Sequence, residues 1–394
     1  MILGVPKERL EGERRVAALP ETAARYVEMG FHVLVEASAG EGVFRSDAEY
    51  AARGAEIVPE AETLYRRSDV VLKVKGPCLD PRTGRHEVEL LREGSILISF
   101  LHPAAPMNHE MVRMLCERNV TSFTMDGIPR ISRAQPMDAL TSMSTVTGYK
   151  AVLMAAEALP RFVPLMSTAV GAIQPARALV VGAGVVGLQA IATARRLGAV
   201  VTAVDIRPEA RREAGSLKGT KVAGFEVPET LAVGEGGYAR ALPEEELAKE
   251  RELLAGLLRE TDMAILSALV PGEVAPALVT EEMLPAMRPG SVIVDVSIDQ
   301  GGNCSATELG RVKVSRGVTI FGTANIPGSM PVDATWLYAA NLLRYVENLF
   351  QRGLGSPDFD DEIVRASLVT RGGKIRHAGT LKAMGLPAAG EPAR

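Results

Sequence analysis

The feature that most constrains this chain is a glycine pattern within an apolar run, ALVVGAGVVGLQAIATARRLGAVVTAVDIR, at positions 178–207. Gly182, Gly184 and Gly187 follow a short Val-rich segment and open a segment of helical period. The first glycine permits a tight turn, the second lets a ligand approach the backbone, and the third allows close helix–strand packing. A strand, a glycine turn and a helix in this order predict a nucleotide-binding βαβ unit.

Asp205 ends the next predicted strand, where such a unit places the acid that binds the adenosine ribose. Its negative charge disfavours a 2′-phosphate, which predicts NAD(H) rather than NADP(H) as the cofactor, although Arg207 weakens that preference. The diphosphate is expected at the start of the following helix, where backbone N–H groups are free. The alternatives are a glycine-rich turn that binds another nucleotide or none, and the complete pattern disfavours both.

Short runs rich in Val and Ile alternate with longer segments of helical period along the chain, which is typical of βαβ units around buried parallel strands. The strands expected first are 1–6, 32–36, 70–74, 95–100 and 121–125. A second series is expected at 178–182, 200–205, 263–269, 291–297 and 319–325. The sequence therefore predicts an α/β fold with two Rossmann-like, doubly wound parallel sheets.

Long helices are expected after each series, at about 137–159 and 333–350, and they would join the two sheet domains. The chain of 394 residues exceeds the ~100–200 residues usual for one domain. We expect a discontinuous N-terminal catalytic domain, 1–136 plus 331–380, and an NAD(H)-binding domain at 137–330. The polar end, 381–394, is expected to be disordered.

Composition excludes several classes of function. The formal net charge of −4 provides no basic surface for nucleic acid. The three cysteines and five histidines show no disulfide or metal-ligand spacing, so no metal is expected. The most apolar stretch, 178–194, is interrupted by glycines, and the N-terminus lacks a signal-peptide pattern. We therefore expect a cytoplasmic protein with no membrane span of its own.

Several motifs together resemble the alanine dehydrogenase / pyridine nucleotide transhydrogenase α-subunit family over almost the whole chain. Both branches of that family share motifs similar to GVPKE, GERRVAALPE, VLVEASAGEGVF and YAARGAEIV. The transhydrogenase branch is resembled by IPRISRAQPMDALTSM, GAIQPARALVVGAGVVGLQAIATARRLGAVV, GGYAR, LVPGEVAPALVTEEML, QGGNC and DDEIVRASLVTRGGKI.

This resemblance assigns roles to residues of the transhydrogenase-like segments. Arg130, Gln135 and Asp138 match residues that hold the nicotinamide and its neighbourhood, and Tyr238 matches the start of a mobile loop. Alternatively, Arg130 and Asp138 form a salt bridge and Tyr238 is an ordinary loop aromatic. The expected cofactor-binding residues are Gly182, Gly184, Val185, Val186, Gly187, Asp205, Ile206, Arg207, Tyr238, Ala268 and Leu269.

Four other residues resemble the catalytic set of alanine dehydrogenase. Arg15, Lys75, His102 and Asp299 match its substrate-carboxylate binder, carbonyl-contacting lysine, acid/base histidine and supporting aspartate, and ANIPGSMP leans the same way. His102 follows the carboxyl end of a predicted strand, where open α/β sheets place their sites. The alternatives are that Arg15 and Lys75 are surface charges and that His102 is a loop histidine.

The two branches differ in their chemistry. A transhydrogenase moves a hydride directly between two nicotinamides, so it needs orientation and no general base. An amino-acid dehydrogenase must also handle a proton and water, for which His102 would titrate beside Arg15 and Lys75. Because the transhydrogenase-like segments are longer, the resemblance implies the NAD(H)-binding subunit of a proton-translocating NAD(P) transhydrogenase of the Si-specific/Re-specific type. The alternatives are an NAD-dependent alanine dehydrogenase that converts L-alanine to pyruvate, and a catalytically silent NAD-binding regulatory module.

The resemblance also implies partners. It implies a homodimer that docks on membrane-embedded transhydrogenase subunits and on a subunit that binds NADP(H), which would hold the protein at the inner face of the cell membrane. The chain ends where the membrane segments of a fused α subunit would begin, so it resembles the separate soluble portion of a split α subunit.

Overall fold

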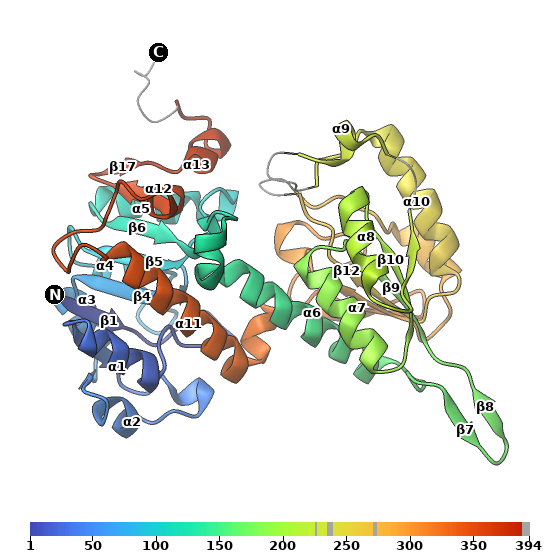
Figure 1. Ribbon diagram of the computed structural model, residues 1–394, viewed down its shortest axis with the longest axis horizontal. Helices are drawn as coiled ribbons and strands as arrows, with labels where there is room; N and C mark the ends of the chain where they lie inside the picture. The colour runs from blue at the N-terminus through green and yellow to red at the C-terminus, as the bar shows by residue number, and fades with distance from the viewer. Residues whose placement is uncertain (225–226, 235–238, 271–273, 388–394) are drawn as a thin grey trace. The chain divides into compact units, whose positions relative to one another are not determined.

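The computed structural model describes residues 1–224, 227–234, 239–270 and 274–387. The chain divides into two compact units. Unit 1 combines Met1–Met143 with the C-terminal portion of the chain from Gly328, and unit 2 is Ser144–Pro327. Each unit contains one large, mainly parallel sheet with helices on both faces (Figure 1). The predicted α/β fold with two doubly wound sheets is therefore confirmed.

The sheet of unit 1 has the strand order β17-β16-β6-β5-β4-β1-β2-β3. Strands β1 to β6 are parallel, whereas β16 and β17 are added antiparallel at one edge. The strands are β1 (Ile2–Val5), β2 (His32–Glu36), β3 (Glu56–Val58), β4 (Val70–Lys75), β5 (Ile96–Phe100), β6 (Thr121–Thr124), β16 (Leu368–Arg371) and β17 (Lys374–Ile375). The five strands predicted for this sheet are confirmed within one or two residues at each end.

Helices cover both faces of this sheet because the side chains of its strands alternate between two cores. Leu97 of β5 belongs to a core that includes Val112 and Leu115, while Phe100 packs against Tyr338 on the opposite face. The helices are α1 (Pro20–Glu28), α2 (Asp47–Ala51), α3 (Ala61–Arg67), α4 (Glu87–Leu90), α5 (His109–Glu117), α11 (Pro331–Leu349), α12 (Glu362–Ser367) and α13 (Ala378–Ala383). Short 3₁₀ turns are η1 (Glu41–Val43), η2 (Pro106–Asn108), η3 (Met125–Gly127) and η4 (Ser132–Met137).

The sheet of unit 2 has the order β11-β10-β9-β12-β13-β15-β14, with only β14 antiparallel. Six parallel strands of each unit thus follow the same 3-2-1-4-5-6 order, and the five strands predicted for unit 2 are also confirmed. The strands are β9 (Arg177–Val181), β10 (Val200–Val204), β11 (Lys221–Ala223), β12 (Met263–Leu266), β13 (Val292–Asp295), β14 (Val312–Ser315) and β15 (Val318–Phe321). A separate hairpin joins β7 (Met166–Thr168) and β8 (Gly171–Ile173).

Two cores lie on the two faces of the second sheet. The first contains side chains of α6, α7 and α8, and the second contains side chains of α10 and of the turn η6. The predicted long helices are confirmed as α6, which connects the units along the chain, and α11. The remaining elements are α6 (Ala139–Ala158), α7 (Val185–Arg196), α8 (Pro208–Ser216), α9 (Glu229–Ala232), α10 (Glu244–Leu258), η6 (Glu281–Ala286), η7 (Ile298–Gln300) and η8 (Ile326–Ser329).

Some elements were not expected from the sequence. Strands β3, β11, β14, β16 and β17 are short and lie at or near sheet edges. Helix α13 continues to Ala383, past the expected start of the tail at 381, because His377 accepts the N–H of Thr380 and Leu381 is buried. Within the described portion of the chain, no helix is both long and apolar enough to cross a membrane.

Gly187 marks the closest approach between α7 and the turn after β9. A Cβ at Gly187 would lie 1.8 Å from the carbonyl oxygen of Gly182. We therefore expect Gly187→Ala to lower the free energy of unfolding by at least ~1–3 kcal/mol, the usual cost of overpacking. Urea denaturation followed by circular dichroism would measure the change.

Gly256→Ala on α10 is the matched control. An added Cβ there meets no atom within 4 Å, and replacing a glycine in a helix interior by alanine stabilises by roughly 0.5–1 kcal/mol. Equal effects of the two substitutions would contradict the close approach at Gly187.

Candidate functional site

The glycine turn of unit 2 is fixed by its contact with the neighbouring strand. Gly182 follows β9 with a φ of 88°, in the left-handed region that favours glycine. A Cβ there would lie 2.7 Å from the carbonyl oxygen of Ser267, just beyond β12. The hydroxyl of Ser267 in turn donates to the carbonyl oxygens of Val181 and Gly182, both at 3.1 Å. The turn is therefore held at the carboxyl ends of the central strand pair, β9 and β12.

Gly184 is the N-cap of α7, and the space beside it is open. A Cβ built on Gly184 meets no atom within 4 Å, although its φ of −77° suits any residue. The N–H of Leu188 is bonded to the carbonyl oxygen of Gly184, which leaves the N–H groups of Val185, Val186 and Gly187 without carbonyl partners within the helix. Free N–H groups beside open space suit an anionic group such as a diphosphate.

Asp205 is 7% exposed and both of its oxygens are bonded. One oxygen accepts the N–H of Ala183 at 2.7 Å, and the other accepts the N–H of Arg207 at 2.8 Å. The guanidinium of Arg207 donates to both, at 3.1 and 3.0 Å. Because these four contacts occupy the acceptor positions of the carboxylate, a ribose hydroxyl could bind Asp205 only by displacing the guanidinium.

The other expected cofactor contacts lie around this turn. Ile206 packs beside a small core of Val227, Ala232 and Leu242. Ala268 and Leu269 follow β12 and are partly exposed. Tyr238 lies outside the described residues.

Asn303 is a residue of this site that the sequence analysis did not single out. Its side chain is fully buried, and its amide oxygen accepts the N–H of Ala268 at 2.9 Å. Its amide nitrogen donates to the carbonyl oxygens of Ala268 and Pro276, both at 2.9 Å. Asn303 thus fixes both ends of the segment that follows β12. It belongs to the motif QGGNC, but nothing in the sequence indicates which backbone groups its amide meets.

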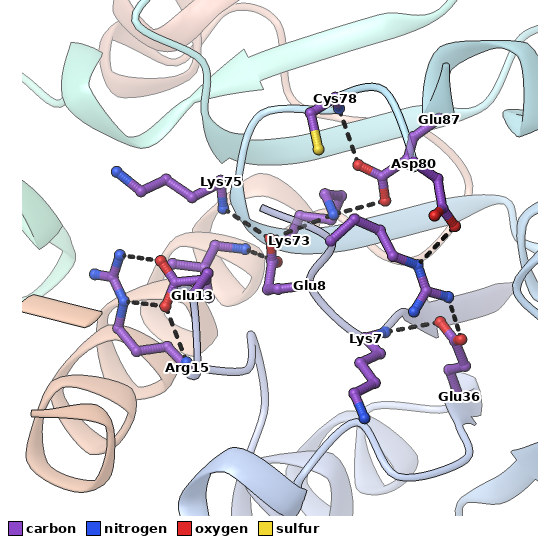
Figure 2. A network of polar contacts seen from close by, with 12 residues as sticks. Lys7, Glu8, Glu13, Arg15, Glu36, Lys73, Lys75, Cys78, Asp80 and Glu87 are labelled. Atoms are coloured by element: carbon purple, nitrogen blue, oxygen red, sulfur yellow. Dashed lines mark hydrogen bonds and ion pairs between the residues drawn. The ribbon is translucent and has the colours of Figure 1, made fainter. Parts of the chain in front are cut away.

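At the corresponding edge of unit 1 the chemistry is different. Figure 2 shows buried charges beyond the carboxyl ends of β1 and β4. The fully buried ammonium of Lys73 lies 2.9 Å from an oxygen of Glu87 and 3.3 Å from Glu8. Burial lowers the pKa of Lys73, but the two carboxylates outweigh it and the net shift is upward. Burial raises the pKa of Glu8 overall, whereas Lys73 draws the pKa of Glu87 below its usual value against the effect of burial.

Arg15 and Lys75 lie beside this cluster. Arg15 is 3% exposed, and its guanidinium donates to both oxygens of the Glu13 carboxylate, at 2.8 and 2.6 Å. The alternative that Arg15 is a surface charge is therefore wrong. Lys75 is partly exposed, and its backbone N–H contacts Glu8 at 3.4 Å. A cavity of about 300 Å³ next to Arg15 is lined by Lys7, Glu8, Glu13, Arg14 and Glu41, among others.

His102 lies just beyond β5 in an unusual conformation. Its φ is 43°, its ring stacks on Phe100 with centroids 5.6 Å apart, and Nδ1 lies 3.3 Å from a carboxylate oxygen of Asp126. Burial raises the pKa of Asp126, but the charge and hydrogen bonds of His102 outweigh it and shift the pKa well down. The strand partner of Lys75 is Phe100, two residues before His102. His102 is thus a half-exposed, oriented imidazole close to the end of β4.

The segment expected to hold a nicotinamide leads into α6. Arg130 lies between η3 and η4, Gln135 lies in η4, and both are exposed. The carboxylate of Asp138 accepts the N–H of Thr141 at 2.8 Å and its hydroxyl at 2.6 Å, so Asp138 caps α6. Its role in the fold is therefore clear.

The last candidates lie apart from these groups. Asp299 is exposed in η7 and belongs to unit 2, whereas Arg15, Lys75 and His102 belong to unit 1. In the described ranges no three or more acidic, cysteine or histidine side chains gather as they would around a metal ion. Burial raises the pKa of the Cys78 thiol to about 11, which leaves it unreactive near neutral pH.

Comparison with known families accounts for both sites. The C-terminal domain model of alanine dehydrogenase/PNT matches residues 151–378, and the N-terminal domain model matches residues 4–147. The chain belongs to the alanine dehydrogenase/PNT family. The resemblance seen in the sequence is thereby confirmed.

Relatives of both kinds cover nearly the whole chain. The first portion of the split NAD(P) transhydrogenase subunit alpha of Rhodospirillum rubrum is 42% identical over 96% of this chain and 98% of its own. An alanine dehydrogenase of Methanococcus maripaludis is 31% identical over 98% and 97%. Among solved structures, a transhydrogenase from Sinorhizobium meliloti is 37% identical with a TM-score of 0.81, covering 96% of this chain and 99% of its own. An L-alanine dehydrogenase has the same TM-score at 28% identity, covering 98% and 99%.

Lys73→Met would leave Glu8 and Glu87 buried without their cation. We expect the free energy of unfolding to fall by ~3–5 kcal/mol near neutral pH, the usual cost of breaking a buried ion pair. Without Lys73, both carboxyls have pKa values above those of the unfolded chain, so the variant loses stability as pH rises. The deficit should therefore be smaller at about pH 5 than at about pH 8 in urea denaturation.

The double variant K73M/E87Q is the control, because it removes one of the two stranded charges. It should be more stable than K73M alone at about pH 8. A deficit in K73M that does not change with pH would contradict the ion-pair assignment.

Proposed function

We propose that this chain is the NAD(H)-binding subunit of a proton-translocating NAD(P) transhydrogenase. In this proposal it exchanges a hydride between its own NAD(H) and NADP(H) bound on a partner subunit. The observation that carries the proposal is the turn after β9, with open space at Gly184 and the carboxylate of Asp205 at the end of β10. The higher identity to the transhydrogenase relative, 42% against 31% for the alanine dehydrogenase, favours this branch.

The residues of the turn fit a dinucleotide. The free N–H groups at the start of α7 would bind the diphosphate, and Asp205 would accept a ribose hydroxyl in place of Arg207. Ala268 and Leu269, positioned by Asn303, would border the same cofactor. The bound nicotinamide supplies the hydride chemistry, so the protein need only position its ring. In this proposal Arg130, Gln135 and Asp138 perform that positioning.

The partners follow from the same proposal. The transhydrogenase relatives whose names describe only a portion of subunit alpha imply further subunits in their own complexes. We propose that this chain forms a homodimer and docks on membrane-embedded subunits and on an NADP(H)-binding subunit. Proton translocation would then take place in those partners, and this chain would lie at the inner face of the membrane.

Gly184→Val tests the cofactor site without disturbing the fold. The valine side chain would occupy the open space at Gly184, so the variant should fold normally but bind NADH at least ~100-fold more weakly, a loss of about 2.7 kcal/mol. Calorimetric titration of wild type and variant with NADH would measure this. Reconstituted with an NADP(H)-binding subunit, the wild type should exchange hydride between the two cofactors and the variant should not.

Ser356→Val, in the C-terminal portion of unit 1, is a control for a general effect of an added apolar side chain. It should bind NADH as the wild type does. If wild type and Gly184→Val bind NADH equally, the proposed site is wrong; if NADH binds but no hydride is exchanged with the partner, the chain is better described as a silent NAD-binding module.

A second candidate function is favoured by one observation in unit 1. His102 is held in a left-handed conformation, stacked on Phe100 and paired with Asp126. Such a conformation in a non-glycine residue persists only where its surroundings enforce it, often at functional sites. Together with Arg15 and Lys75, this arrangement supports an alanine dehydrogenase activity, in which His102 would exchange the proton and the two cations would hold the carboxylate and carbonyl of the substrate.

This activity can be measured directly. If it exists, the purified chain reduces NAD⁺ in the presence of L-alanine, seen as NADH absorbance, and His102→Ala lowers the rate by ~100-fold or more. His109→Ala is the matched control and should leave the rate unchanged. Absence of NADH formation in wild type would remove the second candidate and leave the transhydrogenase proposal intact.

A further inference from the structure

Glu250 is a buried carboxyl group that the proposed chemistry does not use. It is 4% exposed and lies on α10. No hydrogen bond or ion pair joins its side chain to another of the described residues, although nearly every buried charged group in unit 1 has such a partner. A buried carboxylate without a partner is costly, so its position calls for an explanation.

The face of α10 that carries Glu250 packs against the end of β10. Leu254 and Leu258 share a core with Val204, the last residue of β10. One turn earlier, Leu247 packs beside Ile206, which follows Asp205. Positions 247, 250, 254 and 258 lie on one side of a helix. Glu250 therefore occupies a position of this apolar face between the contacts to Val204 and Ile206.

The charges near Glu250 are unevenly balanced. Burial raises the pKa of Glu250 to about 7, and the negative charge of Asp205 adds to the increase, whereas Arg251 of the same helix opposes it. Arg207 is paired with Asp205, and Arg211 donates to the backbone carbonyls of Asp205 and Ile206. Arg251 is paired with Glu244, and Glu246 with Lys249. Ionised Glu250 would thus add an unbalanced negative charge beside Asp205.

We propose that Glu250 is a second specificity-determining carboxylate of the adenosine-ribose site, which acts with Asp205 to exclude a 2′-phosphate and does so more strongly as pH rises. This inference rests on the proposed binding of NAD(H) at the turn after β9. The chemical basis is simple: NADH carries only hydroxyls on this ribose, while NADPH carries a phosphate of charge about −1.5 to −2 at neutral pH. Unionised Glu250 leaves Asp205 and Arg207 as a neutral pair, and ionised Glu250 makes the site negative.

The test is the ratio of the dissociation constants for NADPH and NADH, measured by calorimetry on the full chain at several pH values between about 6 and 8.5. In wild type we expect this ratio to increase about tenfold over that range, as one added charge near the phosphate would produce. The 2′-phosphate itself titrates near pH 6 and contributes to the change. Glu250→Gln retains that contribution and the shape of the side chain, so its ratio should increase much less.

Glu252→Gln is the matched control. Glu252 is exposed and lies two residues further along α10, on the opposite side of the helix, so the variant removes the same charge from a position that does not face β10. Its ratio should follow that of wild type. Equal pH dependence in wild type and Glu250→Gln would overturn the inference, even where NADH binds tightly.

A second measurement locates the titration within the fold. A carboxyl whose pKa is raised on folding, from 4.5 to about 7, loses stability as pH rises between these values. Wild type should therefore lose stability relative to Glu250→Gln as pH increases from about 4.5 to about 7, and no further above that. A difference that does not change with pH would show that Glu250 does not titrate as proposed. If wild type binds neither nucleotide at any pH, the proposed function fails together with this inference.

Discussion

The functional groups of both units depend on the point at which the strand order of each sheet reverses. In each sheet the crossovers leave a central strand pair in opposite directions, β1 with β4 in unit 1 and β9 with β12 in unit 2. The loops beyond the carboxyl ends of such a pair diverge to opposite faces, so the edge between them stays accessible. Gly182 and Ser267 lie at this edge in unit 2, and the loop containing Glu8 lies at it in unit 1.

The same edge has different chemistry in the two units because the first loops differ in sequence. Beyond β9 the glycines bring backbone N–H groups to the surface, and a helix begins at once. Beyond β1 the chain continues as Pro6, Lys7 and Glu8, and α1 begins only at Pro20. The first edge can therefore bind an extended anion through the backbone, whereas the second must rely on charged side chains. Burying those side chains requires compensation, which Lys73 and Glu87 provide.

The sequence predicted the central strands, the two long helices and the glycine turn because each has a strong local signal. The edge strands were not predicted: β3 and β11 have three residues each, and β16 is stabilised mainly by pairing with β6, far away in the sequence. Single contacts within the site were also beyond its reach. Glu13 beside Arg15, Asp126 beside His102 and Asn303 beside Ala268 depend on how side chains meet in three dimensions.

The pairing of Asp205 with Arg207 bears on how tightly a cofactor would be held. A ribose hydroxyl at Asp205 replaces the hydrogen bonds of the guanidinium and adds none to a free acceptor, so the net gain in binding free energy is smaller than for an unpaired carboxylate. In a transhydrogenase NAD(H) is a substrate that must leave after each hydride exchange, and uniformly tight binding would slow its release without raising the rate of transfer. An acid that is already satisfied before binding therefore suits the proposed function, because it preserves selection for the ribose while limiting the total affinity.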